Sequence, residues 1–274
     1  TVGAEVSPLS LRDVIERHGG EIWFQREKAV HRMLFRLVLP VAATPDVQVE
    51  EQTSHLRGES RPEYYDFDLF AARDAEGSGI DLDRRLIDVA YSVFDTETTG
   101  LEPSNGDEII QIGAVRIVNN RLLRQEVFDQ LVDPQRDIPP AGIPIHGITP
   151  EMVAGKPRIG QVLPAFHAFA SDTVLVAHNA AFDMRFLQLK EEATGVRFDQ
   201  PLLDTLLLSA VVHPNQESHQ LEVIAERFGI TVVGRHTALG DAMVTAEVFL
   251  KLLPLLAEKG IHTLGQAREA AQKT

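Results

Sequence analysis

The sequence predicts an α/β fold: a mixed sheet, in which an antiparallel meander is continued by parallel strands, flanked by helices. Three apolar runs between residues 87 and 132 follow one another with only short breaks, which is typical of an antiparallel meander. After residue 160, short apolar runs alternate with helical patterns, which favours parallel strands between helices. A separate helix-plus-hairpin pattern stands near the N-terminus.

The meander begins with the buried strand "IDVAYSVFD" and continues in two longer strands, "EIIQIGAVRIV" and "RLLRQEVFDQLV". The Asn119-Asn120 pair between these two suits the positive φ of a tight hairpin turn. The Pro- and Gly-rich loop "DIPPAGIPIHGITP" follows. The elements expected after it are a helix near 160–170, the strand "TVLVA", a helix opening after His178-Asn179, the strand "PLLD", and helices near 206–212, 221–228, 238–256 and 264–272.

Residues 1–42 show a different local pattern. Apolar residues at Leu11, Val14 and Ile15 mark one face of a short helix, which Gly19-Gly20 ends. The runs "EIWF" and "MLFRLVLP" then alternate like two strands of a hairpin. This order resembles the C-terminal end of a histidine-kinase ATP-binding domain; another helix-plus-hairpin fragment is the alternative. Because the asparagine-bearing helix and glycine-rich lid of such domains are absent, we expect no ATP site here.

Residues 43–85 are rich in Pro, Gly, Ser and charge and lack sustained periodicity, which is typical of a linker. Its piece "YYDFDLF" is too aromatic for a solvated tether, so we expect these rings to dock on a neighbouring domain. The α/β domain then occupies residues 86–274. Since the chain starts without Met, we interpret it as a fragment of a longer protein, with sensor- or kinase-like domains upstream through which the full protein could associate with a membrane.

Composition limits the class of protein. The chain has 274 residues, 44% of them hydrophobic, and no apolar run is long enough to cross a bilayer. We therefore expect a cytoplasmic fragment with no direct membrane insertion. Cysteine is absent, which excludes disulfides and thiolate metal sites. The net charge of −14 disfavours a sequence-independent coat on nucleic acid, but it leaves a local nucleic-acid site open.

Two carboxylates end the first strand of the meander, in "VFDTETTG". Asp95 and Glu97 are two residues apart, so on a strand both point to the same face. Like charges side by side are unfavourable without a cation, and no Lys or Arg occurs between Arg85 and Arg116. A divalent metal resolves the conflict, and hard oxygen ligands favour Mg²⁺ or Mn²⁺ over Zn²⁺.

A lone Asp-x-Glu pattern is weak evidence for a metal site. Further residues that could bind a metal or transfer a proton strengthen this evidence. Asp183, in "VAHNAAFD", stands near the start of a helix after an apolar strand, where the helix dipole alone would also favour a carboxylate. Asp241, in "HTALGDA", lies on an amphipathic helix, with His236 five residues earlier. Together these residues indicate a metal site with a neighbouring imidazole in an α/β frame.

The set "FDTETTGL", "HNAAFD" and "HTALGDA" resembles the DEDDh group of DnaQ-like 3'-5' exonucleases, which includes the proofreading epsilon subunit of bacterial DNA polymerase III. The similarity covers about residues 88–256 and includes "IHGITPEMVAGKP". It implies a ribonuclease H-like fold. The spacing of His236 and Asp241 selects the histidine branch of the family over the tyrosine branch.

The resemblance implies a role for each member of the set. Two divalent cations, Mg²⁺ or Mn²⁺, would be held by Asp95, Glu97, Asp183 and Asp241 and would assist hydrolysis of the 3'-terminal phosphodiester. His236 would take the proton of the attacking water, and a nucleoside 5'-monophosphate would leave.

The substrate contacts that the resemblance implies surround the metal ligands. Six residues are expected to line the cleft or hold the 3'-terminal nucleotide: Thr96, Thr98, Leu101, His178, Asn179 and Phe182. Structural roles stay open for two of them, because His178 could serve the fold alone and Phe182 could belong to the core.

The expected substrate is a single-stranded 3' end, of DNA in the first place. Exoribonuclease or short-oligonucleotide hydrolase activity is the alternative within the same class, since the motifs are shared and the 2'-hydroxyl is read by pocket shape. A non-catalytic regulatory or scaffold module of a signalling protein is the alternative from another class, motivated by the histidine-kinase-like segment.

Overall fold

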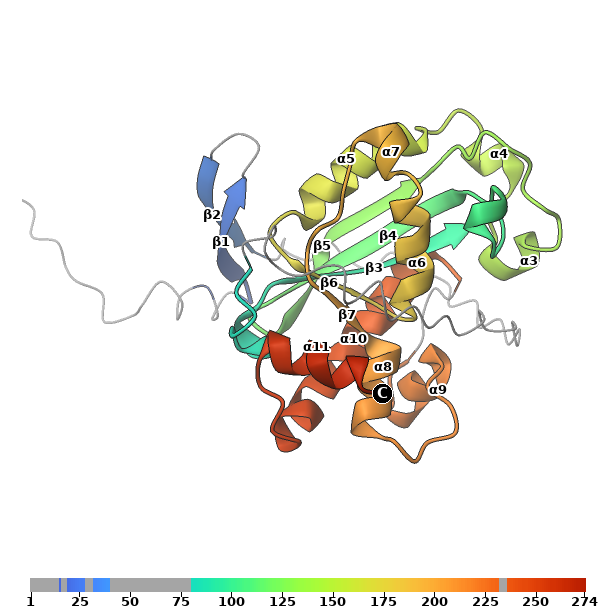
Figure 1. The fold of residues 1–274 in the computed structure, drawn as a ribbon. Coiled ribbons are helices and arrows are strands. Elements are labelled where there is room, and N and C mark those ends of the chain that lie inside the picture. Colours follow the sequence, from blue (N-terminus) through green and yellow to red (C-terminus); the bar gives the residue numbers. More distant parts are fainter. Residues whose placement is uncertain (1–14, 16–18, 28–31, 40–79, 232–235) are drawn as a thin grey trace, which may run out of the picture. The chain divides into compact units, whose positions relative to one another are not determined.

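The computed structural model describes residues 15, 19–27, 32–39, 80–231 and 236–274, which are coloured in Figure 1. The chain divides into two compact units, Thr1–His55 and Leu56–Thr274. Most of the predicted linker and its aromatic piece lie outside the described residues, as does the predicted N-terminal helix apart from Ile15.

The first unit contains the predicted hairpin. Strands β1 (Glu21–Glu27) and β2 (Arg32–Val38) pair antiparallel. Phe24 lies opposite Phe35, and the two rings meet edge to face at a centroid distance of 5.5 Å. Gly20 precedes β1, where a Cβ would lie 2.6 Å from the carbonyl oxygen of Val38, so only glycine fits this approach of the two backbones.

The second unit is built on a five-stranded sheet in the order β5-β4-β3-β6-β7. Strands β3 (Tyr91–Thr98), β4 (Ile109–Val118) and β5 (Arg121–Leu131) form the predicted antiparallel meander. Asn119 and Asn120 turn between β4 and β5 with φ of 51° and 61°, as predicted. Strands β6 (Val174–Ala177) and β7 (Leu202–Asp204) continue the sheet parallel to β3.

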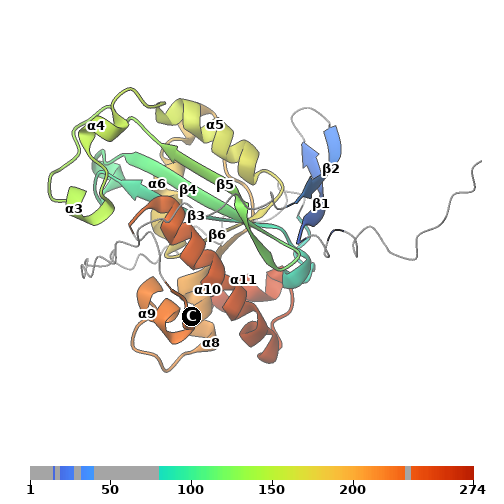
Figure 2. The same cartoon turned by 180° about the vertical axis from the view of Figure 1, so that it is seen from behind.

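Helices cover both faces of this sheet (Figures 1 and 2). Helix α10 packs across β3, β4 and β5, while α5 and α6 pack on strands from the other side. The helices described after β5 are α3 (Ile143–His146), α4 (Pro150–Val153), α5 (Ile159–Ala170), α6 (Ala180–Gln188), α7 (Glu191–Thr194), α8 (Thr205–Val212), α9 (Leu221–Arg227), α10 (Ala238–Glu258) and α11 (Leu264–Gln272).

The core lies on both sides of β3 and β4, because every residue of these two strands is buried. Phe94, for example, is fully buried and packs on Phe166 of α5, and Tyr91 packs on Phe249 of α10. A strand covered on both faces carries apolar side chains at nearly every position. The polar residues at the end of β3 are therefore exceptions that need an explanation.

The segment before β3 is joined to the start of α11. The Leu86 N–H donates to the His262 carbonyl at 2.9 Å, and the Leu264 N–H donates to the Arg84 carbonyl at 3.0 Å. Helix α11 therefore closes the unit against the residues that lead into the sheet. Among the described helices, each is too short or too polar to span a bilayer.

Candidate active site

The site starts at the carboxyl end of β3. Asp95 and Glu97 are two residues apart on one strand and are 8% and 6% exposed. The pairing with β4 shifts register between Glu97 and Thr98, so the strand bends where the carboxylates end it. Two nearly buried carboxylates thus stand on the same face, at the edge from which the chain leaves the sheet.

Gly113 on β4 lets a helix approach these carboxylates. It lies opposite Asp95 in the sheet register. A Cβ at this position would lie 2.1 Å from the amide nitrogen of Leu239 and 2.2 Å from the carbonyl carbon of Ala238. The first turn of α10 therefore lies directly on the backbone of β4, a contact that no other residue type would permit.

Two side chains fix the start of α10. The Ala238 N–H donates to Oε1 of Gln111 at 3.2 Å, and the Nε2 of Gln111 donates to Asp129 at 2.8 Å. Thr237 is the N-cap, and its Oγ1 accepts from the Gly240 N–H at 3.1 Å. Asp241, in the first turn of this helix, is thereby directed to the end of β3.

Asp95, Glu97 and Asp241 form one cluster, in which one carboxylate oxygen from each lies within 4.8 Å of the others. The donors are all hard oxygens, they come from a strand and a helix that are held together, and two of the three residues are buried. Three ionised carboxylates so close repel one another strongly unless a positive charge lies beside them. The residues present therefore fit a divalent cation of the Mg²⁺ or Mn²⁺ type.

Asp183 on α6 adjoins this cluster without belonging to it. Its carboxylate is fully buried, and Oδ1 accepts from the Thr96 N–H at 3.0 Å and from the Thr96 hydroxyl at 2.5 Å. Thr96 stands between Asp95 and Glu97. The fourth predicted carboxylate is therefore bonded to the strand residue between the first two.

Asp204, at the end of β7, holds the helix that carries Asp183, and the sequence did not predict this role. It is 3% exposed, and its carboxylate accepts from the Asn179 N–H at 3.0 Å and the Ala180 N–H at 2.8 Å, at the start of α6. It also caps α8 through the Leu206 N–H at 2.8 Å. One side chain thus satisfies backbone donors of two helices.

Burial raises the pKa of Asp204 to about 6, and the negative charge of Asp183 adds to the rise, while the three N–H groups act against it. Next to Asp204, the Thr205 hydroxyl donates to the Ala177 carbonyl at 3.3 Å and contacts Nδ1 of His178 at 2.9 Å.

His236 stands in the turn before α10, with a φ of 61° and a half-buried side chain. It lies outside the cluster of three carboxylates. Only one residue separates it from the first turn of α10, which carries Asp241. The left-handed backbone of a non-glycine residue at this position is a feature that functional turns often retain.

The structure places the predicted substrate contacts as follows. Thr98 is 8% exposed and its hydroxyl donates to the Gly100 carbonyl at 2.7 Å, while Leu101 is 46% exposed. Asn179 has a left-handed backbone at the N-cap of α6. Phe182 is 3% exposed and packs on Phe186, within the core.

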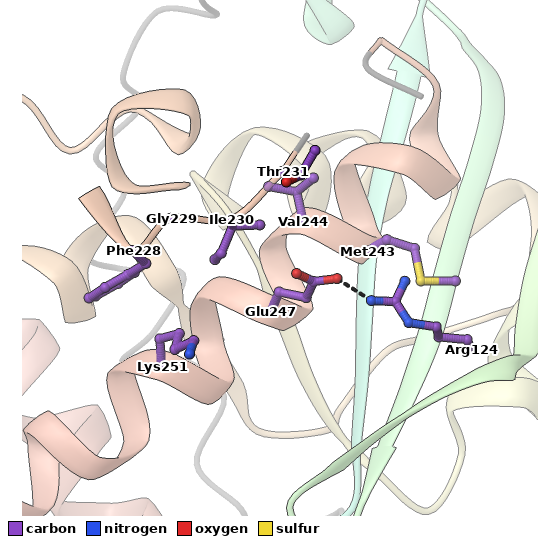
Figure 3. Close-up of a pocket in the computed structure, with 9 residues that line it drawn as sticks. All are labelled: Arg124, Phe228, Gly229, Ile230, Thr231, Met243, Val244, Glu247 and Lys251. Atoms are coloured by element: carbon purple, nitrogen blue, oxygen red, sulfur yellow. Dashed lines mark hydrogen bonds and ion pairs between the residues drawn. The ribbon is translucent and has the colours of Figure 1, made fainter. Parts of the chain in front are cut away.

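Two hollows also lie on this unit. One, of about 470 Å³, is lined by the chain after α9, by α10 and by Arg124, which pairs with Glu247 (Figure 3). The other, of about 620 Å³, lies beside Arg136 and Lys190. Neither is lined by the three clustered carboxylates, so the chemistry of the donor set, not the size of a cavity, marks the candidate site.

Residues 92–249 match the exonuclease family RNase_T, and the chain therefore belongs to this family. Its second unit carries this exonuclease domain, and the predicted residues Asp95, Glu97, Asp183, His236 and Asp241 all lie within the matched range.

Two relatives in sequence have names that refer to DNA polymerase III. A DNA polymerase III subunit epsilon-like protein of Rhodobacter capsulatus is 46% identical over 96% of this chain. A PolC-type DNA polymerase III of Caldanaerobacter subterraneus subsp. tengcongensis is 41% identical over 64% of this chain. The chain spans 36% of the length of the first relative and 12% of the second.

Solved structures confirm the ribonuclease H-like fold. Exonuclease X in complex with 5' overhanging duplex DNA is 27% identical, has a TM-score of 0.54, and is matched over 66% of this chain and 99% of that one. The nuclease domain of 3'hExo, a DEDDh family member bound to rAMP, is 18% identical with a TM-score of 0.55, over 66% of this chain and 97% of that one.

Proposed function

We propose that this chain is a two-metal-ion 3'-5' exonuclease that hydrolyses the 3'-terminal phosphodiester of single-stranded DNA and releases nucleoside 5'-monophosphates. The observation that carries the proposal is the cluster of Asp95, Glu97 and Asp241, with ligand oxygens within 4.8 Å of one another. Membership of the exonuclease family supports it.

The four carboxylates would hold the cations, Mg²⁺ or Mn²⁺. Asp95, Glu97, Asp183 and Asp241 would be these ligands, as the family resemblance implies. When bound, two divalent cations stabilise the negative charge on the attacking and leaving oxygens of an in-line phosphoryl displacement. The protein's part is to hold four carboxylates at fixed positions, which the contacts of Gly113 and Asp204 support.

His236 would act as the general base. An imidazole has an ordinary pKa near neutrality, so it accepts the proton of an attacking water at physiological pH. Its place in a turn directly before α10 keeps it near Asp241 in the chain without making it a member of the carboxylate cluster. A base at the border of the site can exchange its proton with solvent after each turnover.

The residues after Glu97 would receive the 3'-terminal nucleotide. Leu101 is a large apolar side chain that is 46% exposed, which suits contact with a base or sugar. Thr98 lies between the metal ligands and this leucine. His178 and Asn179 would border the same cleft from the start of α6.

Comparison with relatives supports DNA as the substrate. Of the relatives named above, one is like the epsilon subunit of DNA polymerase III and the other is a PolC-type DNA polymerase III. Exonuclease X, at 27% identity, is solved with 5' overhanging duplex DNA. The nucleic-acid partner would be a single-stranded 3' end, which enters a site whose local charge is reversed by the cations, although the chain as a whole carries a net charge of −14.

A matched pair of digestions tests the proposal. DNA and RNA strands of one sequence, labelled at the 5' end, are incubated with Mg²⁺ or Mn²⁺, beside Asp95→Ala and His236→Ala. We expect a ladder of single-nucleotide steps on DNA that is lost in Asp95→Ala and weakened in His236→Ala. A ladder mainly on RNA would change the assigned substrate from DNA to RNA. Full activity in Asp95→Ala would contradict the assignment of the active site. If the folded protein gave no ladder on either strand, a scaffold role would be favoured.

We also propose that residues 1–42 are the closing part of a histidine-kinase-like ATP-binding domain, followed by a linker over 43–85 and the nuclease domain over 86–274. The hairpin of β1 and β2 is the part of this order that the described residues contain. The similarity to the epsilon-like relative extends over 96% of the chain, so it includes most of this segment. The sequence upstream of Thr1 tests it: an asparagine-bearing helix and a glycine-rich lid are expected there, and their absence would contradict the proposal.

A further inference from the structure

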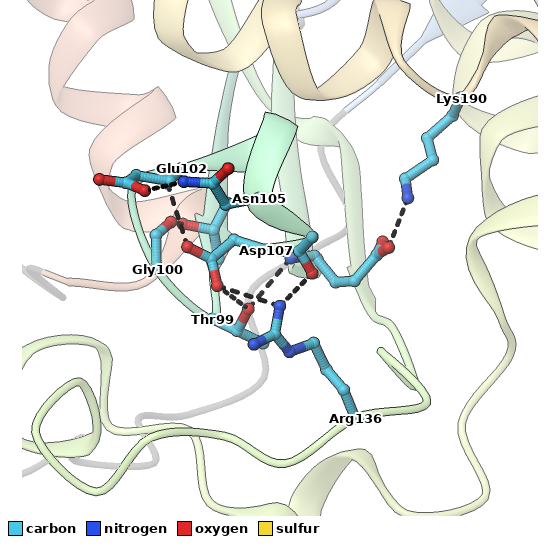
Figure 4. Close-up of polar contacts among 10 residues, drawn as sticks. Thr99, Gly100, Glu102, Asn105, Asp107, Arg136 and Lys190 are labelled. Atoms are coloured by element: carbon cyan, nitrogen blue, oxygen red, sulfur yellow. Dashed lines mark hydrogen bonds and ion pairs between the residues drawn. The ribbon is translucent and has the colours of Figure 1, made fainter.

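The loop between β3 and β4 (Figure 4) follows directly on the strand that carries Asp95 and Glu97. Leu101 belongs to this loop. Its two ends are joined, since the Thr99 N–H donates to the Glu108 carbonyl at 2.8 Å and the Glu108 N–H donates to the Thr99 hydroxyl at 3.0 Å. Glu108 also pairs with Lys190, after α6, at 2.6 Å. The base of the loop is therefore fixed to the sheet and to the segment between α6 and α7.

Asp107 fixes the interior of this loop. Its Oδ1 accepts from the Thr99 hydroxyl at 3.1 Å, and its Oδ2 accepts from the Glu102 N–H at 3.0 Å. The side chain of Asp107 is 17% exposed, although it is charged. A single carboxylate thus connects the residue before Gly100 with the residue after Leu101.

Arg136, which follows β5, completes the contact. Its Nη1 lies 3.1 Å from Oδ1 of Asp107 and donates to the Gly106 carbonyl. The guanidinium therefore neutralises the carboxylate and binds the loop backbone at the same time. We call Asp107 and Arg136 together the loop clamp.

Gly100 shows how closely the carboxylate fits the loop. A Cβ at this position would lie 2.2 Å from Oδ2 and 2.6 Å from Cγ of Asp107. The absence of a side chain at Gly100 is what lets the Asp107 carboxylate reach the Glu102 N–H. Clamp and glycine therefore form one arrangement, and either can be changed to disturb it.

We propose that the loop clamp positions the binding surface for the 3'-terminal nucleotide: Asp107, neutralised by Arg136, holds the loop so that Thr98 and Leu101 face the substrate. This rests on the proposed exonuclease function and deepens it. Asp107 acts through the loop and touches neither the metal ligands nor the reacting phosphate in this role. Loss of the clamp therefore weakens substrate binding and leaves the chemical step nearly intact.

Steady-state kinetics on a 5'-labelled single-stranded DNA test this for Asp107→Asn and Gly100→Ala. An asparagine would present an NH₂ group to Arg136 or to the Glu102 N–H, which are donors themselves. In both variants we expect KM to rise about tenfold and kcat to change less than about threefold, a split that indicates lost binding. Arg136→Lys keeps the positive charge and should therefore keep most of the affinity of the wild type. Arg136→Met removes the charge and should raise KM as much as Asp107→Asn does.

Matched controls exclude general effects of the substitutions. Gly160→Ala has the same change as Gly100→Ala at a position where nothing lies within 4 Å of the added carbon. Asp199→Asn removes another aspartate that pairs with an arginine, Arg197, at 2.7 Å. Both controls should keep the KM of the wild type.

Three results would overturn the inference. A fall in melting temperature with KM unchanged would make the clamp a purely structural contact. A fall in kcat with KM unchanged would place its effect on the chemical step. A normal KM in Gly100→Ala beside a raised KM in Asp107→Asn would assign the effect to charge and not to the loop. Failure of the proposed function itself is a different observation, because the wild type would then give no ladder at all.

Discussion

Two helices bring carboxylates to β3, and they are attached to the sheet in different ways. Helix α10 carries Asp241 and lies on the bare backbone of β4 at Gly113. Helix α6 carries Asp183 and is held at its start by the buried carboxylate of Asp204. The first attachment depends on space, and the second depends on charge.

The difference has a physical consequence. At Gly113 the helix α10 packs against backbone that has no side chain and therefore no titratable group. This contact should not change with pH. A contact made by a carboxylate with a pKa raised to about 6 changes when that group takes up a proton. One site thus combines a steric and an electrostatic attachment, and each can be broken separately.

Gly113→Ala breaks the steric attachment and should have the largest effect. The added carbon meets backbone atoms of Ala238 and Leu239, which can move only if the helix moves. We expect the free energy of unfolding to fall by about 3 kcal/mol and the exonuclease rate to fall by a hundredfold or more, as for other displaced catalytic groups. Urea unfolding and the rate of ladder formation, each at two pH values, measure these effects. The losses of stability and of rate should be equal at both pH values. A rate equal to that of the wild type would contradict the steric account.

Asp204→Asn breaks the electrostatic attachment and should lower the rate by about tenfold at neutral pH, because an amide cannot accept from every N–H that the carboxylate serves. Its effect on stability should depend on pH. The raised pKa means that the folded state binds the proton more tightly than the unfolded chain does. The stabilising contribution of protonated Asp204 is therefore full below its ordinary pKa of 3.8 and is lost as the pH rises through about 6.

The unfolding free energies of wild type and Asp204→Asn, measured across this range, should show the change. We expect their difference, wild type minus variant, to decrease by roughly 3 kcal/mol between acid and neutral pH, since one pKa unit corresponds to about 1.4 kcal/mol. The charged group that faces Asp204 is Asp183 on α6, so Asp183→Asn serves as the matched control for their mutual repulsion. A constant difference would show that Asp204 does not titrate in this range.

Metal-dependent stabilisation separates the two attachments further. A hundredfold excess of Mn²⁺ over its dissociation constant stabilises a protein by about 2.7 kcal/mol, which a melting scan detects. We expect the wild type to respond and Asp95→Ala not to respond. Gly113→Ala should also lose the response, because Asp241 leaves the cluster, whereas Asp204→Asn should keep part of it, because Asp95, Glu97 and Asp241 stay together. Equal stabilisation by Mn²⁺ in Gly113→Ala and Asp204→Asn would contradict the distinction between the steric and the electrostatic attachment.

The sequence predicted the five strands of this sheet and its longer helices from local pattern, and it predicted the carboxylate set from local pattern together with a family resemblance; the structure brings three members of that set together. Alternation along "VFDTETTG" gives the shared face of Asp95 and Glu97. The four-residue helices α3 and α4 were not predicted; they lie in a Pro- and Gly-rich loop and are too short for a period to show. The placement of β6 beside β3 also has no local signal.

Asp204 and Gly113 show where local reasoning ends. An aspartate before a helix signals an N-cap, and Asp204 does cap α8. Its bonds to Asn179 and Ala180 join segments about 25 residues apart, and nothing in "PLLD" announces them. Gly113 likewise stands in a strand pattern, where an isolated glycine indicates a close approach but does not name the partner.

The smallest predicted effect is on stability, and it comes from replacing glycines that the fold requires to different degrees. Gly160→Ala, in the first turn of α5, meets nothing within 4 Å and should raise the free energy of unfolding by about 0.5 kcal/mol through helix propensity. Gly155 also has open space around it but a φ of 73°, so Gly155→Ala should be destabilising by about 1 kcal/mol. Urea unfolding of these two variants and of Gly113→Ala should give free energies of unfolding in a fixed order. Gly160→Ala should be the most stable because of its helix propensity, Gly155→Ala should be less stable because of backbone strain, and Gly113→Ala should be the least stable because of steric overlap. A loss of stability in Gly160→Ala would show that local propensity does not set the stability of α5.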